Sequence, residues 1–240
     1  MRQLLLAAFL TYLAGCQPMP VTAPEALEAP PARVATRGGA IYRVDAARTD
    51  IRILIYRAGA LASLGHNHVI SAQAVSGLVF VQPRLTESTF ELSLPVGELV
   101  VDEPAARAEA GEEFSSLPSA EDIEGTRENM FSTQLLDFPR YRTISVTGRL
   151  TSAGASPEVD LAVRVKERTM QKAVPVALSI HEDLLTIGGT IELSHEELGL
   201  EPFSVMMGAL RVAETITLRF RVTAARSFET ESRLAPSDLS

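Results

Sequence analysis

Hydrophobic and polar residues alternate along most of residues 41–226. In residues 159–166, for example, aliphatic residues occupy every second position, and Asp160, Arg164 and Lys166 lie between them. Such alternation is typical of an antiparallel strand with one dry face and one wet face. It predicts about eight strands, one of which is long and kinked near Gly77. The predicted strands centre on residues 51–55, 68–82, 90–96, 144–150, 159–166, 174–180, 187–193 and 216–222.

Two segments break the alternation, residues 103–113 and residues 119–134. Both are expected to form short helices on the surface, the second with Ser119 as its N-cap ahead of Asp122. Asp102 flanks these segments, and a role in a turn accounts for it. No repeat of fixed length and no second core is indicated. The pattern therefore predicts one all-β domain with one or two short helical inserts, built as a sandwich or a closed barrel.

The predicted inward positions are almost entirely aliphatic or Phe, and none of them carries a charge. An eight-stranded barrel has an interior that side chains can just fill, or that can hold one small ligand. The alternation fits a filled core and an apolar ligand tunnel equally well. For a tunnel, the expected ligand-binding residues are Phe90, Leu92, Leu94, Ile144, Val146, Leu178, Ile180, Ile187, Ile191, Leu218 and Phe220.

Composition narrows the class of protein. The chain has 240 residues, and 46% of them are hydrophobic, which is enough for a sizeable core in one domain. The 22 Lys and Arg residues are outnumbered by 30 Asp and Glu residues and are scattered singly, which argues against a nucleic-acid partner. One cysteine excludes an internal disulfide and a cysteine-based zinc or iron–sulfur site.

The N-terminus has the features of an export signal. Arg2 supplies a positive charge, and residues 4–13 form an almost unbroken apolar run. That run is about half of the ~20 residues that span a bilayer, which argues against a transmembrane helix. The tetrapeptide Leu13-Ala14-Gly15-Cys16 resembles the bacterial lipobox, in which the cysteine is lipidated and becomes the first residue of the mature chain. The alternative is an ordinary secretory signal with a chance cysteine.

The chain therefore divides into four predicted segments. Residues 1–15 are a lipoprotein signal peptide, and residues 16–39 are the lipidated Cys16 with a flexible, Pro-rich tether. Residues 40–226 form the barrel domain, and residues 227–240 are a loose polar tail. Gln17 follows the cysteine, which resembles the pattern of lipoproteins sorted to the outer membrane. We expect a protein on the periplasmic side of the cell envelope, anchored in the outer membrane through Cys16.

Residues 65–68, with the sequence Gly-His-Asn-His, form the most distinctive local motif. In an extended chain, His66 and His68 lie on one face and are placed to present two imidazoles to a metal ion or to a polar ligand. A catalytic zinc needs a third ligand, and His181 and His195 lie on other predicted elements. The alternatives are histidines that bond to nearby backbone groups, or histidines at a barrel mouth that face the polar end of a lipid. The mouth candidates are His66, Asn67 and His68, and no metal is assigned to them.

The sequence lacks the usual catalytic motifs. It has no Gly-x-Ser-x-Gly nucleophile elbow and no glycine-rich phosphate loop between a strand and a helix. Adjacent carboxylates such as Glu112 and Glu113 are expected to be solvated surface charges. The single thiol is assigned to the lipid anchor. We therefore predict a protein that is not an enzyme and that needs no cofactor.

Taken together, several short motifs resemble the YceI-like, or polyisoprenoid-binding, family. No single motif is diagnostic, but their order and spacing over residues 41–222 are fairly specific. The motifs are Tyr42-Arg43-Val44-Asp45, residues 50–57 leading into residues 65–68, Leu94-Pro95-Val96, Leu99-Val100-Val101-Asp102, Ile123-Glu124-Gly125-Thr126-Arg127-Glu128-Asn129-Met130, Pro202-Phe203-Ser204-Val205 and Gly208-Ala209-Leu210-Arg211-Val212.

This resemblance implies a lipocalin-like, eight-stranded antiparallel β-barrel in a protein exported to the periplasm. In such a barrel, an apolar tunnel holds a long isoprenoid or other amphiphilic chain. The implied partner is a polyisoprenoid or quinone-like lipid bound without covalent linkage. Two alternatives stay open, a metal-binding or metal-dependent protein that uses residues 65–68 and a ligand-free envelope scaffold with a filled barrel.

Overall fold

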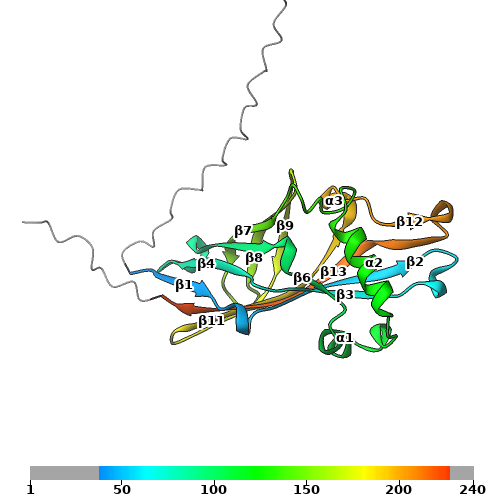
Figure 1. Cartoon of the computed structure of the whole chain (residues 1–240). Coiled ribbons are helices and arrows are strands. Elements are labelled where there is room, and N and C mark those ends of the chain that lie inside the picture. The colour runs from blue at the N-terminus through cyan, green and yellow to red at the C-terminus, as the bar shows by residue number, and fades with distance from the viewer. Residues whose placement is uncertain (1–37, 228–240) are drawn as a thin grey trace, which may run out of the picture. The chain divides into compact units, whose positions relative to one another are not determined.

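The computed structural model describes residues 38–227 (Figure 1). Within this range the chain forms a 13-stranded sheet and three α-helices. The strands are β1 (Ala40–Val44), β2 (Asp50–Ala58), β3 (His68–Ala72), β4 (Ser76–Val81), β5 (Thr89–Pro95), β6 (Leu99–Val101), β7 (Thr143–Ser152), β8 (Glu158–Val165), β9 (Arg168–Pro175), β10 (Ala177–His181), β11 (Leu184–Ser194), β12 (Ser204–Val205) and β13 (Leu210–Arg226). The helices are α1 (Pro104–Ala110), α2 (Ala120–Phe131) and α3 (His195–Leu198).

The predicted signal peptide, residues 1–15, lies outside the described residues. So do the predicted tether, except residues 38 and 39, and the predicted tail, except Ser227. No helix in the described part of the chain is long and apolar enough to cross a membrane.

The longest strand, β13, organises the sheet. It pairs with β2, β11, β1 and β12, and every strand pair is antiparallel. In the register, Leu218 of β13 lies between Ile53 of β2 and Ile191 of β11. The three aliphatic side chains therefore share one face of the sheet, because residues opposite one another in a ladder point to the same side. From β13, one path of the sheet runs through β1, β4, β5, β7 and β8 to β9, and the other runs through β2 and β3 to β6.

A bend after β9 carries the chain around a corner of the fold. Only Val176 separates β9, which pairs with β8, from β10, which pairs with β11. Pro175 ends β9 at this point, and proline has no N–H to continue a ladder. Gly189 of β11 lies close to this corner, since a Cβ there would be 3.2 Å from the Pro175 carbonyl oxygen. No ladder joins β9 to β11, so hydrogen bonds do not close the sheet.

The predicted antiparallel all-β fold is confirmed. With β9 and β10 taken as one bent strand, eight strands follow one another around a circuit, namely β1, β4, β5, β7, β8, β9–β10, β11 and β13. Seven of the predicted strands contribute to it, whereas the predicted strand at residues 51–55 is β2, which lies outside the circuit, and β1 takes the remaining place. The higher number of observed strands arises because two predicted strands are each divided, into β3 and β4 and into β9 and β10, and because β1, β6 and β12 were not among the predicted strands.

The prediction of one continuous strand over residues 68–82 was wrong. Residues 68–82 are two strands, β3 and β4, separated at Gln73, Ala74 and Val75, and not one strand kinked near Gly77. The backbone of Ala74 is left-handed, with φ of 53°, which is incompatible with a continuous strand. β3 pairs with β2 and β6, whereas β4 pairs with β1 and β5. The alternation spans the break, so it could not reveal that the two halves join different parts of the sheet.

Both predicted helical segments contain helices. Ser119 caps α2 as predicted, and its hydroxyl and the carboxylate of Asp122 form a reciprocal capping box. The prediction that both helices lie on the surface was incomplete. α1 buries Ala106, Arg107 and Ala110, and α2 buries Met130.

The side chains under α1 form a second, small core. Leu54 of β2 and Val69 of β3 are fully buried there, together with Ala106, Ala110 and Phe114. The rings of Phe114 and Tyr56 meet edge to face at 5.4 Å between their centroids. This cluster fixes α1 against the start of β3, which is where residues 65–68 lie.

Candidate functional site

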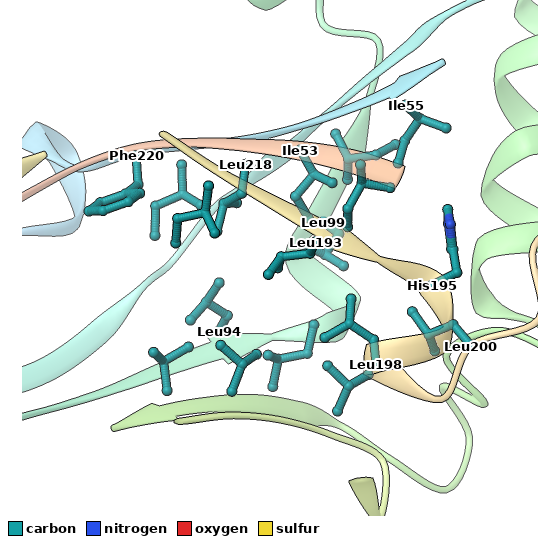
Figure 2. Close-up of a pocket in the computed structure, with 18 of the residues that line it drawn as sticks. Ile53, Ile55, Leu94, Leu99, Leu193, His195, Leu198, Leu200, Leu218 and Phe220 are labelled. Carbon is teal, nitrogen blue, oxygen red and sulfur yellow. The ribbon is translucent and has the colours of Figure 1, made fainter. Parts of the chain in front are cut away.

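An apolar cavity of about 410 Å³ lies within the curved sheet. Its walls come from β2, β3, β4, β5, β6, β7, β8, β10, β11 and β13, and α2, α3 and the segment after α3 also contribute to the lining. Figure 2 shows Leu218 and Phe220 of β13 on one side of this space and Leu94 of β5 on the other. Because Arg57, Gln134 and Glu201 belong to the lining and are exposed, the cavity reaches the molecular surface.

The structure places every apolar residue of the predicted ligand-binding set in the lining of this cavity. They are Phe90, Leu92, Leu94, Ile144, Val146, Leu178, Ile180, Ile187, Ile191, Leu218 and Phe220. Strand alternation was sufficient for these residues, because it separates the inward face from the outward face regardless of how the sheet curves.

The three mouth candidates separate in the structure. His66 and His68 line the cavity, with their ring centroids 6.4 Å apart, and Asn67 does not. The Asn67 amide nitrogen instead donates to the Glu113 carbonyl (2.9 Å), and its amide oxygen accepts from the backbone N–H of Arg57 (3.0 Å). Alternation explains this outcome, since the residue between two inward histidines points outward. Asn67 is a structural clamp and not a mouth residue.

A buried ion pair holds His68 in place. Asp102 follows β6 with a left-handed backbone, φ of 56°, and its side chain is fully buried. Its Oδ2 lies 2.6 Å from Nδ1 of His68. Its Oδ1 accepts from the backbone N–H of Val69 (2.9 Å) and from the buried guanidinium of Arg107 (2.5 Å). Asp102 therefore does more than the predicted turn residue, because it anchors a cavity-facing imidazole to α1.

The pKa of Asp102 reflects this environment. Burial by itself would raise the pKa of the carboxyl group. The hydrogen bonds from His68, from the Val69 N–H and from Arg107 outweigh burial, and the pKa is lowered from its ordinary value. Asp102 is therefore a carboxylate at neutral pH.

His195 is a third imidazole in the lining, which sequence reasoning did not select as a site residue. It begins α3, and its Nδ1 lies 3.1 Å from the Glu214 carbonyl oxygen, to which it can donate. Burial lowers its pKa, and the hydrogen bonds to backbone carbonyls only partly offset that effect. Figure 2 places His195 at one end of the cavity, close to Leu198 and Leu200. No period-two signal could find it, because α3 is a single short turn between two strands.

Other lining residues were missed for different reasons. Ile51, Ile53 and Ile55 of β2 had the correct alternation but were not included in the predicted set. Thr126 and Met130 of α2 belong to a helix that was expected to lie on the surface. Helix packing against a sheet depends on tertiary contacts, so the sequence of α2 alone did not indicate its inner face.

The histidines were also candidates for a metal. Among residues 38–227, no group of three or more His, Cys, Asp or Glu side chains is arranged to hold a metal ion. His66 approaches Asp122, with 3.7 Å between Nε2 and Oδ2, and its Nδ1 is buried without a hydrogen-bond partner. Within the described residues, His66 and His68 therefore lack the third ligand that a zinc site requires.

Among the comparisons with known proteins, the one with solved structures identifies the fold. The sequence matches no protein-family model and no curated protein. Among solved structures, BcnA of Burkholderia cenocepacia matches with a TM-score of 0.57 and 12% identity, over 76% of this chain and 99% of that chain. The YCEI protein of Campylobacter jejuni matches with a TM-score of 0.45 and 7% identity, over 67% of this chain and 85% of that chain. The chain therefore has the fold of BcnA, and the lipocalin-like antiparallel barrel predicted from its sequence is confirmed as its fold class.

Proposed function

We propose that this protein binds one long hydrophobic or amphiphilic molecule, a polyisoprenoid or a quinone-like lipid, and catalyses no reaction. The observation that carries the proposal is the cavity of about 410 Å³. Its lining consists mostly of aliphatic and Phe side chains from the inward face of the curved sheet. Ligand sites in proteins commonly measure about 300–1,000 Å³ and are mostly apolar with a few polar groups. A purely structural core would be packed without such a space.

The proposed location follows from the N-terminal sequence. We place the protein on the periplasmic side of the envelope, anchored in the outer membrane by acyl chains on Cys16. Stable anchoring needs two membrane signals, and several acyl chains on one cysteine exceed that requirement. The Pro-rich residues 16–39 would let the folded domain stand away from the lipid headgroups. A Cys16→Ala variant is expected to move from the membrane fraction to the soluble fraction of the envelope, and membrane retention of the variant would overturn the anchor.

The function is tested with the full chain and a neutral, apolar fluorescent probe, N-phenyl-1-naphthylamine, whose emission rises in apolar surroundings. Val146 lines the cavity, whereas its neighbour Thr147 is exposed on the other face of β7. Val146→Phe is expected to weaken probe binding about tenfold, because the larger ring occupies the cavity. Thr147→Phe is the matched control and is expected to bind the probe like the wild type.

Native mass spectrometry of gently extracted protein identifies the natural ligand. We expect a fraction of the chain to carry one additional lipid mass. Equal probe binding by the wild type and both variants, or no binding by the wild type, would contradict the proposal. An unoccupied chain that also fails to bind the probe would favour the ligand-free scaffold.

A further inference from the structure

The two ring nitrogens of His68 lie in different surroundings. Nδ1 is held by Asp102 at 2.6 Å. Nε2 lies on the opposite side of the ring, where Oγ1 of Thr126 is 3.4 Å away. His68 and Thr126 both line the cavity, which is otherwise almost entirely apolar. Nε2 is therefore a polar atom that this part of the cavity offers to a ligand.

The hydrogen-bond partners determine which nitrogen carries the proton. The Asp102 carboxylate only accepts, so Nδ1 of His68 must donate to it. Arg107 already balances the negative charge of Asp102 from within a buried ion pair. In the neutral ring, a proton on Nδ1 leaves a lone pair on Nε2, which then acts as an acceptor.

Thr126 does not satisfy this acceptor. Its hydroxyl hydrogen is donated to the Asp122 carbonyl oxygen at 2.8 Å within α2. With Nδ1 carrying the single proton of the neutral ring, Nε2 has no hydrogen to donate to Thr126 Oγ1, and the 3.4 Å between these two atoms is too long for a strong hydrogen bond. An acceptor left without a donor in an apolar cavity is costly. A donor on the ligand would remove that cost.

We infer that Nε2 of His68 accepts a hydrogen bond from the head group of the bound amphiphile, so that the cavity selects chains that end in a hydroxyl group. The chemical class is a long-chain alcohol or a quinol, in preference to a quinone, an ether or a hydrocarbon. The inference rests on the proposed function and specifies its ligand. Asp102 and Arg107 act as positioning residues, because they fix the tautomer and the orientation of the imidazole.

Two ligands of equal chain length test this selectivity, 1-dodecanol and 1-methoxyundecane. The alcohol can donate a hydrogen bond, whereas the ether can only accept one. Each is titrated against N-phenyl-1-naphthylamine bound to the full chain. We expect the alcohol to displace the probe at about fivefold lower concentration than the ether, the ratio that one neutral hydrogen bond supports. In His68→Phe that ratio is expected to disappear, and in the control His181→Phe, a residue exposed outside the cavity, it is expected to persist.

A measurement on the wild type covers the case in which His68→Phe does not fold. With ¹⁵N-labelled histidine, unprotonated Nε2 gives a pyridine-type resonance, which should move upfield with 1-dodecanol and not with 1-methoxyundecane. An imidazolium signal, or a preference for the ether, would overturn the inference. So would a preference for the alcohol that is unchanged in folded His68→Phe. If neither compound displaces the probe from any variant, the proposed function itself fails, which is a separate outcome.

Discussion

The guanidinium of Arg107 and the carboxylate of Asp102 form an ion pair in which the side chains are only 4% and 0% exposed. Arg107 also donates to the carbonyls of Asn67 (2.8 Å) and Ser116 (2.6 Å). One residue of α1 therefore holds β6, the segment before β3 and the loop before α2. The orientation of His68 in the cavity depends on this arrangement, because Asp102 contacts both Arg107 and His68.

Removing the cation should strongly destabilise the fold. Arg107→Leu leaves the Asp102 carboxylate buried without its charge partner, and the expected loss in the free energy of unfolding is about 3–5 kcal/mol. Urea denaturation followed by circular dichroism measures it. Arg140 pairs with Glu167 on the surface, where the two side chains are 68% and 73% exposed, and Arg140→Leu should lose less than about 1 kcal/mol. Similar losses in the two variants would show that the buried pair has no special role.

Stability should depend on pH through His195. Its pKa is lowered from 6.5 in the folded state, so the unfolded chain takes up a proton first as the pH falls. The stability contributed by neutral His195 is therefore complete above about pH 6.5 and decreases as the pH falls from there towards the lowered pKa. Urea denaturation at pH 8 and pH 5.5 should show a smaller difference in His195→Asn than in the wild type. His181→Asn, at an exposed position, should retain the full difference.

Gly148 of β7 should not tolerate a side chain. A Cβ there would lie 2.4 Å from the ring of Phe90 and 2.7 Å from the carbonyl oxygen of Asp160. Gly148→Ala is therefore expected to displace the Phe90 ring, which lines the cavity, and to lower the free energy of unfolding by about 1–3 kcal/mol. Gly154→Ala provides the comparison, because no atom lies within 4 Å of a Cβ at that position. Equal stability of the two variants would place the Phe90 ring elsewhere.

The alternative of a metal protein is tested by direct analysis. Purified full chain, exposed to zinc and then dialysed, is expected to retain less than one zinc ion per chain, because His66 and His68 lack a third ligand among the described residues. Inductively coupled plasma mass spectrometry gives the stoichiometry. Retention of one zinc per chain that is lost in His68→Ala would favour the metal alternative over the proposed lipid site.

Many of the residues that line the cavity could be predicted from the sequence as inward-facing. The side chains of a strand alternate strictly between two faces, so Phe90, Leu92 and Leu94 were assigned to the inward face without knowledge of the sheet. The capping box of Ser119 and Asp122 was similarly local, since both partners lie within one turn of α2. These features depend on residues that are close in the sequence.

What the sequence could not determine were the contacts between distant residues. Asp102 lies 34 residues from His68, and Thr126 lies 58 residues from it, so no spacing rule connects them. The bend at Val176 and the separation of β3 from β4 were also invisible, because the alternation continues through both. Local periodicity determined which side chains face inward. Only the tertiary structure decided that the apolar faces surround a cavity and that a buried ion pair orients an imidazole in it, because both depend on how the strands pair and curve.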